Sequence, residues 1–344
     1  MEHAVLYTTM GLVLAFYIAW NLGANDAANP TDTAVGAGAV SLRNAILLFS
    51  VFAFLGAVLQ GYMVIKTIGK GVVKNVSPLG ALVASLSAGL WITLATHKGM
   101  PVSTTHSTVG AVLGIGLASE LLGHEAKIDL SVVYKVVLSW ITSPMLAIML
   151  AVAFYVLLAR LASWMKQTGR NVDRFFKYFL LFNLAFSAYA FGTNDVGNAT
   201  GVYVSAVSSI TGMPDRTTMF YLALLGAAGI MLGAFTWGKK VISTVGFKIT
   251  RLDYVSGAAA ELSNALVVWL FSTIPKMLFG YGMPISTTHA SVSSIIGVGL
   301  AKSRSLKGVD WKTVGLIAAS WILTLPVAMG ISATLYILLV HIVG

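Results

Sequence analysis

The feature that most constrains this chain is a series of long apolar stretches without a single charged side chain. The clearest stretches are residues 45–65, 136–159 and 217–238. A helix needs roughly 20 residues to cross a hydrocarbon core about 30 Å thick, so each stretch is long enough to span a membrane. Of the 344 residues, 57% are hydrophobic and 10% are charged, whereas about 25% of a typical soluble domain is charged. The sequence therefore predicts an all-α polytopic membrane protein with about 10–12 membrane segments.

The net charge of +10 does not indicate a nucleic-acid partner, because the basic residues lie between apolar segments and form no single basic patch. The richest group surrounds the middle of the chain and comprises Arg160, Lys166, Arg170, Arg174 and Lys177. Short loops that are dense in Lys and Arg tend to stay cytoplasmic. We therefore expect a multi-pass protein of the cell membrane, with the lipid bilayer around it and the central loop inside the cell.

Two motifs each occur twice, in the same order. Residues 23–29 read GANDAAN and return at 192–198 as GTNDVGN, while residues 99–106 read GMPVSTTH and return at 282–289 as GMPISTTH. Seven of the eight residues of the second motif are identical. Repeated motifs in one order indicate an internal duplication.

The duplication predicts two units, residues 1–165 and 166–344, which meet in the polar segment at 166–173. An odd number of crossings in each half would invert the second unit relative to the first, so both termini would lie outside the cell. Inverted-topology repeats with broken helices and re-entrant hairpins are typical of secondary transporters, whose substrate site lies near the bilayer midplane. The two units are expected to form one transport unit.

The first motif places Asp26 and Asp195 in apolar segments, where an unpaired carboxylate is costly and usually functional. The glycines at 23 and 192 favour a broken helix in both copies. Carboxylate and amide oxygens together suit a hard cation, although Asp and Asn also cap helix ends. The predicted sodium ligands are Asn25, Asp26, Asn194 and Asp195, with Asn29, Asn198, Gln60 and Glu261 as further candidates.

The second motif predicts a helix that begins at Ser103 or Thr104, because Pro101 ends the preceding segment and Ser or Thr caps helix starts. Free amides and hydroxyls at such a start can bind a tetrahedral oxyanion, although plain capping is the alternative. The candidate anion ligands are Ser103, Thr104, Thr105, Ser286, Thr287 and Thr288. The histidines that follow, His106 and His289, are expected behind this layer or in contact with the anion.

No lysine or arginine is shared by the two copies of either motif. Two aspartates and a tetrahedral oxyanion in a low-dielectric site would repel one another unless cations accompany them. Sodium that enters with the anion would neutralise the aspartates and raise the affinity for the anion, which is the linkage that defines a symporter.

At these residues the chain resembles the inorganic phosphate transporter family over essentially its whole length. The resemblance implies import of inorganic phosphate by alternating access, driven by sodium or protons, and a homodimer in the cell inner membrane. It implies co-transported sodium ions and no organic cofactor. Animal relatives have an acidic residue early in the second hydrophobic segment, where this chain has only apolar residues at 52–54.

Several other functions fit parts of the pattern. A proton-coupled carrier and a sulfate carrier are the nearest alternatives, because an aspartate binds either cation and sulfate is also tetrahedral. An intramembrane hydrolase built on Ser103, His106 and an aspartate is disfavoured, since symmetric doubling suits a passage better than one nucleophile. An anion channel is disfavoured because tight capture at two helix ends slows the exit that conduction needs.

Overall fold

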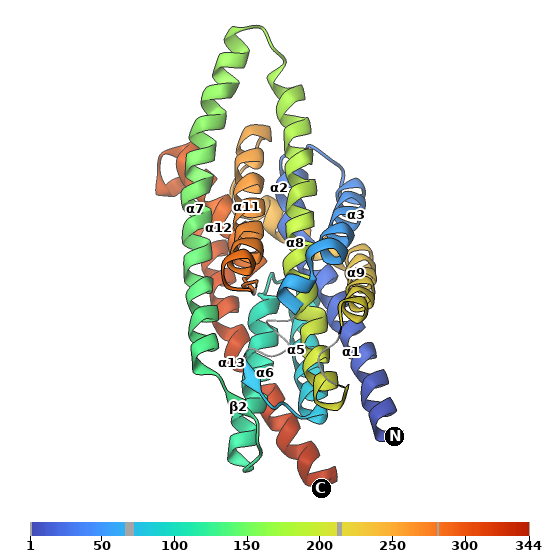
Figure 1. Cartoon of the computed structure of the whole chain (residues 1–344). Helices are drawn as coiled ribbons and strands as arrows, with labels where there is room; N and C mark the ends of the chain where they lie inside the picture. Colours follow the sequence, from blue (N-terminus) through green and yellow to red (C-terminus); the bar gives the residue numbers. More distant parts are fainter. Residues whose placement is uncertain (1, 66–71, 212–214, 281, 344) are drawn as a thin grey trace.

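The computed structural model describes residues 2–65, 72–211, 215–280 and 282–343. These residues form an almost entirely helical bundle (Figure 1). Within them, eight helical spans are long and apolar enough to cross a membrane. The predicted multi-pass helical protein is confirmed.

The first half contains α1 (Glu2–Asp26), α2 (Ala28–Gly36), α3 (Leu42–Gln60), β1 (Val73–Lys74), α5 (Pro78–His97), α6 (Thr104–Leu121), β2 (Lys127–Ile128) and α7 (Leu130–Gln167). The second half contains α8 (Val172–Thr211), α9 (Arg216–Thr236), α10 (Gly238–Lys248), α11 (Tyr254–Phe279), α12 (Thr287–Ser303), the 3-10 turn η1 (Leu306–Gly308) and α13 (Trp311–Val343). The turn between α7 and α8 falls within the predicted boundary at 166–173. It lies at the opposite end of the molecule from both termini (Figure 1).

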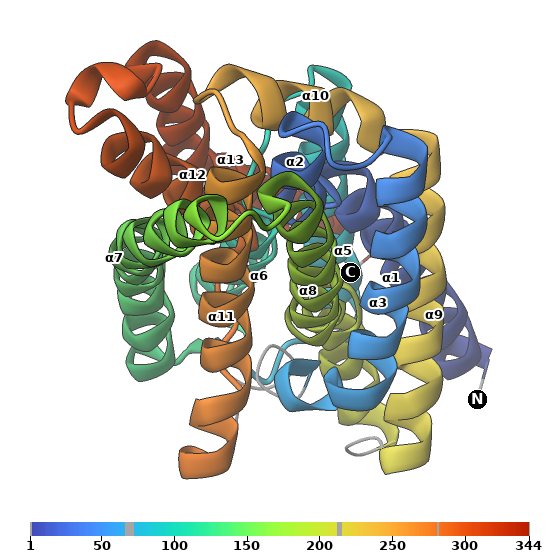
Figure 2. The same ribbon diagram turned by 90° about the horizontal axis from the view of Figure 1, so that it is seen from above.

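Helices of the two halves pack mainly on each other. The helix α1 packs against α9, α3 against α8, α6 against α13 and α7 against α12. Seen from above, α1, α3 and α9 gather on one side and α7, α12 and α13 on the other (Figure 2). The halves are therefore interlocked, and neither forms a separate body.

Two helical hairpins enter the bundle and leave it at the end where they entered. The outer ends of the α5–α6 hairpin are joined because β1 pairs with β2 in antiparallel fashion and Lys74 forms an ion pair with Asp129 at 2.7 Å. The hydrogen bond from Lys74 holds the pKa of Asp129 well below its usual range. The outer ends of the α11–α12 hairpin are joined by an ion pair of 2.7 Å between Asp253 and Lys302. Both segments are hairpins, as predicted, and their re-entry into a membrane stays a prediction.

The two copies of the first motif have different backbones. In the first copy α1 ends at Asp26 and α2 begins at Ala28, whereas the second copy lies inside the continuous helix α8. The broken helix predicted for the second copy is therefore wrong. The physical reason is Pro30, which has no N–H and whose ring would collide with the carbonyl group of residue 26 in an unbroken helix. The matching residue in the second copy is Ala199.

The motif glycines serve close helix packing. A Cβ atom on Gly23 would lie 1.8 Å from the carbonyl oxygen of Ile230, and one on Gly192 would lie 2.0 Å from that of Ala53. Only glycine allows α1 to approach α9, and α8 to approach α3, this closely.

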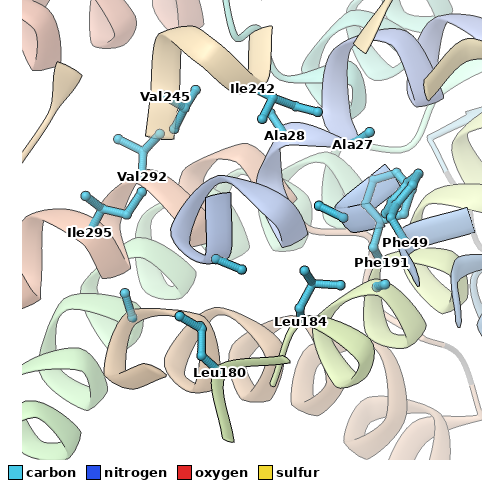
Figure 3. Packing of buried hydrophobic residues seen from close by; sticks show 14 of the residues in the cluster. Ala27, Ala28, Phe49, Leu180, Leu184, Phe191, Ile242, Val245, Val292 and Ile295 are labelled. Carbon is cyan, nitrogen blue, oxygen red and sulfur yellow. The ribbon is translucent and has the colours of Figure 1, made fainter. Parts of the chain in front are cut away.

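The break after Asp26 is enclosed by apolar side chains (Figure 3). Ala27 and Ala28 are fully buried in a cluster that includes Ile242 of α10. In the same cluster the rings of Phe49 and Phe191 lie 5.2 Å apart. The short helix α2 is thus held in the interior rather than at a membrane surface.

Candidate functional site

The tips of the two hairpins meet in the interior. Thr105 of α6 donates a hydrogen bond of 2.9 Å to the carbonyl of Ile285, and Thr288 of α12 donates one of 3.2 Å to the carbonyl of Val102. Each tip therefore binds the extended segment before the other helix. The two copies of the second motif lie far apart in the sequence but form one centre in the structure.

Serine caps begin both tip helices. The side chain of Ser103 accepts a hydrogen bond of 3.2 Å from the amide of His106, and Ser286 accepts one of 3.2 Å from the amide of His289. The predicted helix start at Ser103 is confirmed. Because each cap oxygen only accepts here, its hydroxyl proton remains available to a ligand. The positive ends of two helix dipoles converge on the same place, which favours an anion.

The carboxylate of Asp26 lies at this centre and is fully buried. It accepts hydrogen bonds from Thr104 of its own half at 2.7 Å and from Thr288 of the other half at 3.4 Å. Asn29 donates to the hydroxyl oxygens of Thr287 and Thr288, both at 3.1 Å. The first copy of the first motif thus contacts both copies of the second motif.

Asp195 is also fully buried. It accepts hydrogen bonds from Asn198 at 3.0 Å and from Asn194 at 3.2 Å. Asn198 also donates to the hydroxyl of Thr105 at 3.0 Å. Within the described residues, neither Asp26 nor Asp195 forms an ion pair with a lysine or arginine, so the charge of an ionised pair would need a mobile cation.

Asn25 and Asn194 hold the segments that precede the tips. The side-chain oxygen of Asn25 accepts from the amide of Val102 at 3.2 Å, and that of Asn194 accepts from the amide of Ile285 at 3.3 Å. Asn25 also donates to the carbonyl of Met100 at 3.0 Å. Both amide oxygens already accept backbone hydrogens, so positioning of the tips is the role that the contacts show.

A second buried acidic group lies beyond the break in α1–α2. Asp32 and Glu261 are both fully buried. Asp32 accepts a hydrogen bond of 2.8 Å from Ser291 of α12, and Glu261 accepts one from Thr33. Asn264, one helical turn after Glu261, donates to the carbonyl of Asn29 at 3.1 Å and so connects this group to the first centre.

Four buried oxygen atoms around these groups have no hydrogen-bond donor among the described residues. They are Asp32 Oδ1, Glu261 Oε1, Asn264 Oδ1 and Asn198 Oδ1. Asn198 belongs to the Asp195 centre, and the other three belong to the group of Asp32 and Glu261. Buried acceptors are normally satisfied, so acceptors without donors at these two places suit bound cations.

Asp32 was missed by the sequence reasoning, although it lies in the same apolar segment as Asp26 and its burial cost was a usable signal. It was missed because it has no counterpart in the second half, where the matching residue is Gly201. Gln60 ends α3, and its side-chain oxygen is buried without a hydrogen-bond partner among the described residues. No hydrogen bond in the described part of the chain joins Gln60 to either aspartate.

The two histidines contact aromatic rings. The rings of His106 and His289 lie 4.6 Å apart, and each also contacts a tryptophan, Trp140 at 3.6 Å and Trp321 at 3.9 Å. Within the described residues, no hydrogen bond joins either ring to Asp26 or Asp195. Whether the histidines lie behind the ligand layer or contact the anion stays a prediction.

Helical hairpins whose tips meet at buried carboxylates, inside a bundle of membrane-spanning helices, define the architecture of a secondary transporter. The model of the Phosphate transporter family matches residues 22–332. The chain belongs to this family.

Individual relatives agree along nearly the whole chain. A predicted phosphate permease of Pyrococcus furiosus is 32% identical over 97% of this chain and 96% of its own length. The chloroplastic inorganic phosphate transporter 2-1 of Arabidopsis thaliana is 30% identical over 92% of this chain and 69% of its own. A solved structure described as the sodium-dependent phosphate transporter matches with a TM-score of 0.83 and 30% identity, over 98% of this chain and 100% of that one.

Proposed function

We propose that this protein imports inorganic phosphate together with sodium ions by alternating access, with phosphate at the hairpin tips and sodium beside it. The observation that carries the proposal is the pairing of an anion-binding tip with buried acceptor oxygens that lack donors. Family membership supports phosphate, and the structurally similar sodium-dependent transporter supports sodium.

Phosphate binds between the N-termini of α6 and α12. Its oxygens accept from hydroxyls that now bind protein oxygens, and from the free protons of the two capping serines. The proposed phosphate ligands are Ser103, Thr104, Thr105, Ser286, Thr287 and Thr288. Thr104 and Thr288, now bonded to Asp26, can turn toward phosphate once sodium replaces them at the carboxylate.

Sodium neutralises the carboxylates of Asp26 and Asp195, with Asn29 and Asn198 beside them as oxygen donors. A further sodium binds between Asp32 and Glu261, where the unpartnered oxygens lie. The main role of Asn25 and Asn194 is to position the hairpin tips, because their side-chain oxygens accept hydrogen bonds from backbone amides. Cation and anion then bind cooperatively, since each lowers the electrostatic cost of the other.

The two halves, residues 1–165 and 166–344, act as inverted repeats. The supporting contacts come in equivalent pairs: Asn25 accepts from the amide of Val102, and Asn194 accepts from the amide of Ile285. Exchange between two equivalent arrangements of these pairs would open the tips alternately to either side. A homodimer, implied by the family resemblance, completes the proposal and is tested by light scattering of the purified protein.

Counterflow in proteoliposomes tests the coupling. Labelled phosphate is exchanged with and without sodium at fixed pH, with unlabelled sulfate as a competitor. We expect exchange that requires sodium and resists sulfate. Exchange indifferent to sodium but driven by an imposed proton gradient would replace sodium by protons in the proposal.

Glu261→Gln tests the second sodium site separately. The amide retains the shape and an acceptor for Thr33 but removes the charge. We expect a higher half-saturating sodium concentration, by about tenfold, because a charged ligand is worth roughly 1.5 kcal/mol more than a neutral one. The apparent affinity for phosphate at saturating sodium should stay close to wild type. An unchanged sodium dependence would remove Glu261 from the site.

A further inference from the structure

A basic pocket lies between the C-terminal part of α7 and the end of α12, at the end of the molecule that carries the α7–α8 turn. Its volume is about 500 Å³, and its lining includes Arg160, Lys302 and Arg304. Among its described lining residues there is no acidic side chain. We refer to it as the α7–α12 pocket.

The charges of this pocket are only partly matched. Lys302 is held by the ion pair with Asp253 and by a hydrogen bond of 3.0 Å to the carbonyl of Arg251. Arg160 and Arg304 form no ion pair within the described residues. Two guanidinium groups thus remain available, and guanidinium matches the geometry of a phosphate group.

Arg304 occupies a position that its backbone does not favour. It caps the end of α12 with φ 51° and ψ 28°, in the left-handed region. Glycine or asparagine is the usual residue there, because a side chain at this φ costs about 1 kcal/mol. Helix capping therefore does not account for the arginine at this position.

The α7 side of the pocket carries apolar and aromatic side chains on either side of Arg160. Val156, Ala159, Tyr155 and Trp164 line it, and the side chain of Val156 is 43% exposed. Arg160 is the first charge after the charge-free run at 136–159, and Lys302 is the first charge of α12. Both helices therefore leave the apolar region at the pocket, with Tyr and Trp beside it as at a membrane interface.

We propose that the α7–α12 pocket binds the phosphodiester headgroup of an anionic phospholipid, whose acyl chains lie along the exposed apolar face of α7. Arg160 and Arg304 contact the phosphate, while Lys302 lies at the rim. A soluble phosphate would satisfy the same cations, but it would leave the apolar side chains of α7 beside them without a partner. A lipid matches the cations with its headgroup and these side chains with its acyl chains.

Native mass spectrometry of the full-length protein tests the proposal. The probes are palmitoyl-oleoyl phosphatidylglycerol and the zwitterionic phosphatidylcholine with the same chains. The double variant Arg160→Gln/Arg304→Gly removes both free charges, and Gly at 304 relieves the left-handed backbone. Arg43→Gln at the start of α3 is the matched control, because Arg43 is exposed and lies outside the pocket.

We expect wild type and Arg43→Gln to retain phosphatidylglycerol in preference to phosphatidylcholine. The double variant should bind phosphatidylglycerol about 25-fold more weakly, because each basic residue near an anionic headgroup contributes roughly fivefold. Its thermal stability without added lipid should not fall. Equal retention by the double variant and wild type, or no preference between the two lipids, would overturn the proposal.

Inorganic phosphate is added in a separate arm. Retention of phosphatidylglycerol in the presence of a molar excess of phosphate supports a lipid site. Displacement by phosphate in wild type would identify a soluble-anion site and overturn the lipid assignment. Sodium-dependent phosphate uptake by the double variant in neutral vesicles should match wild type, so this result is independent of the transport proposal.

Discussion

The two copies of the first motif, residues 23–29 and 192–198, have different backbones but place the same side chains at one centre. The first copy is interrupted at Ala27, while the second runs through the continuous helix α8. Nevertheless Asn25 and Asn194 accept hydrogen bonds from equivalent amides, those of Val102 and Ile285. Contacts with the hairpin tips therefore set the side-chain geometry, and a helix break is not required for it.

A second difference lies just beyond the break. The short helix α2 is buried, and there Asp32 accepts a hydrogen bond from Ser291 and Thr33 donates one to Glu261. Asp32 of the first half is matched by Gly201 in the second half, and Glu261 of the second half is matched by Pro78 in the first half. A nearly symmetric anion centre is thus joined to an asymmetric acidic group on one side.

The largest loss of stability is expected when proline is introduced into the second copy, which lies in the continuous helix α8. Ala199→Pro should lower the free energy of unfolding by about 3 kcal/mol or more, because it removes a helical hydrogen bond and collides with the carbonyl of Asp195. Thermal unfolding of the purified protein measures the loss. Val172→Pro is the control, since proline is tolerated in the first turn of a helix. Equal stability of both variants would show that α8 tolerates a break at the motif.

Neutralising the aspartates tests whether the two copies are functionally equivalent. Asp26→Asn and Asp195→Asn should each reduce sodium-dependent phosphate uptake by about 100-fold, because each removes a buried charge that the cation needs. Initial rates in proteoliposomes measure this, and unchanged thermal stability serves as the folding control. Full activity in one of the two variants would show that the paired contacts do not imply paired roles.

Removing the asparagine contacts shows which copy of the first motif contributes more to the free energy of unfolding. Asn25→Ala and Asn194→Ala should each cost about 1–3 kcal/mol, since each leaves buried backbone groups without a partner. The larger loss is expected for Asn194→Ala, because Asn194 also bonds Asp195 and Ser272. Denaturant unfolding measures both. The reverse ranking would mean that the contact of Asn25 with Thr96 outweighs those two bonds.

Restoring the helix in the interrupted copy should have the smallest effect. Pro30→Ala should change the unfolding free energy by less than about 1 kcal/mol, because α2 is already helical and buried. The half-saturating sodium concentration should rise severalfold as Asp32 moves relative to Glu261, while phosphate affinity at saturating sodium changes little. Sodium titrations of phosphate uptake check this. A shift in phosphate affinity alone would place Asp32 at the anion instead.

Much of this site was open to prediction from sequence because its determinants are local or repeated. The serine caps followed from Ser103 and Ser286 after a Gly-Met-Pro segment, and the convergence of the motifs followed from duplication. The error at residues 192–198 arose because glycine was taken as the cause of the break. Pro30, next to the motif, was the residue that mattered.

Hydropathy, proline and capping act over a few residues, so the sequence alone predicts a helical membrane protein with doubled motifs. The contact of Asp32 with Ser291, its grouping with Glu261 and the pocket that Arg160 shares with Arg304 exist only in the folded structure. Those residues are far apart in the chain and have no repeat partners. Their proximity depends on how α7, α11 and α12 pack, a property of the whole bundle.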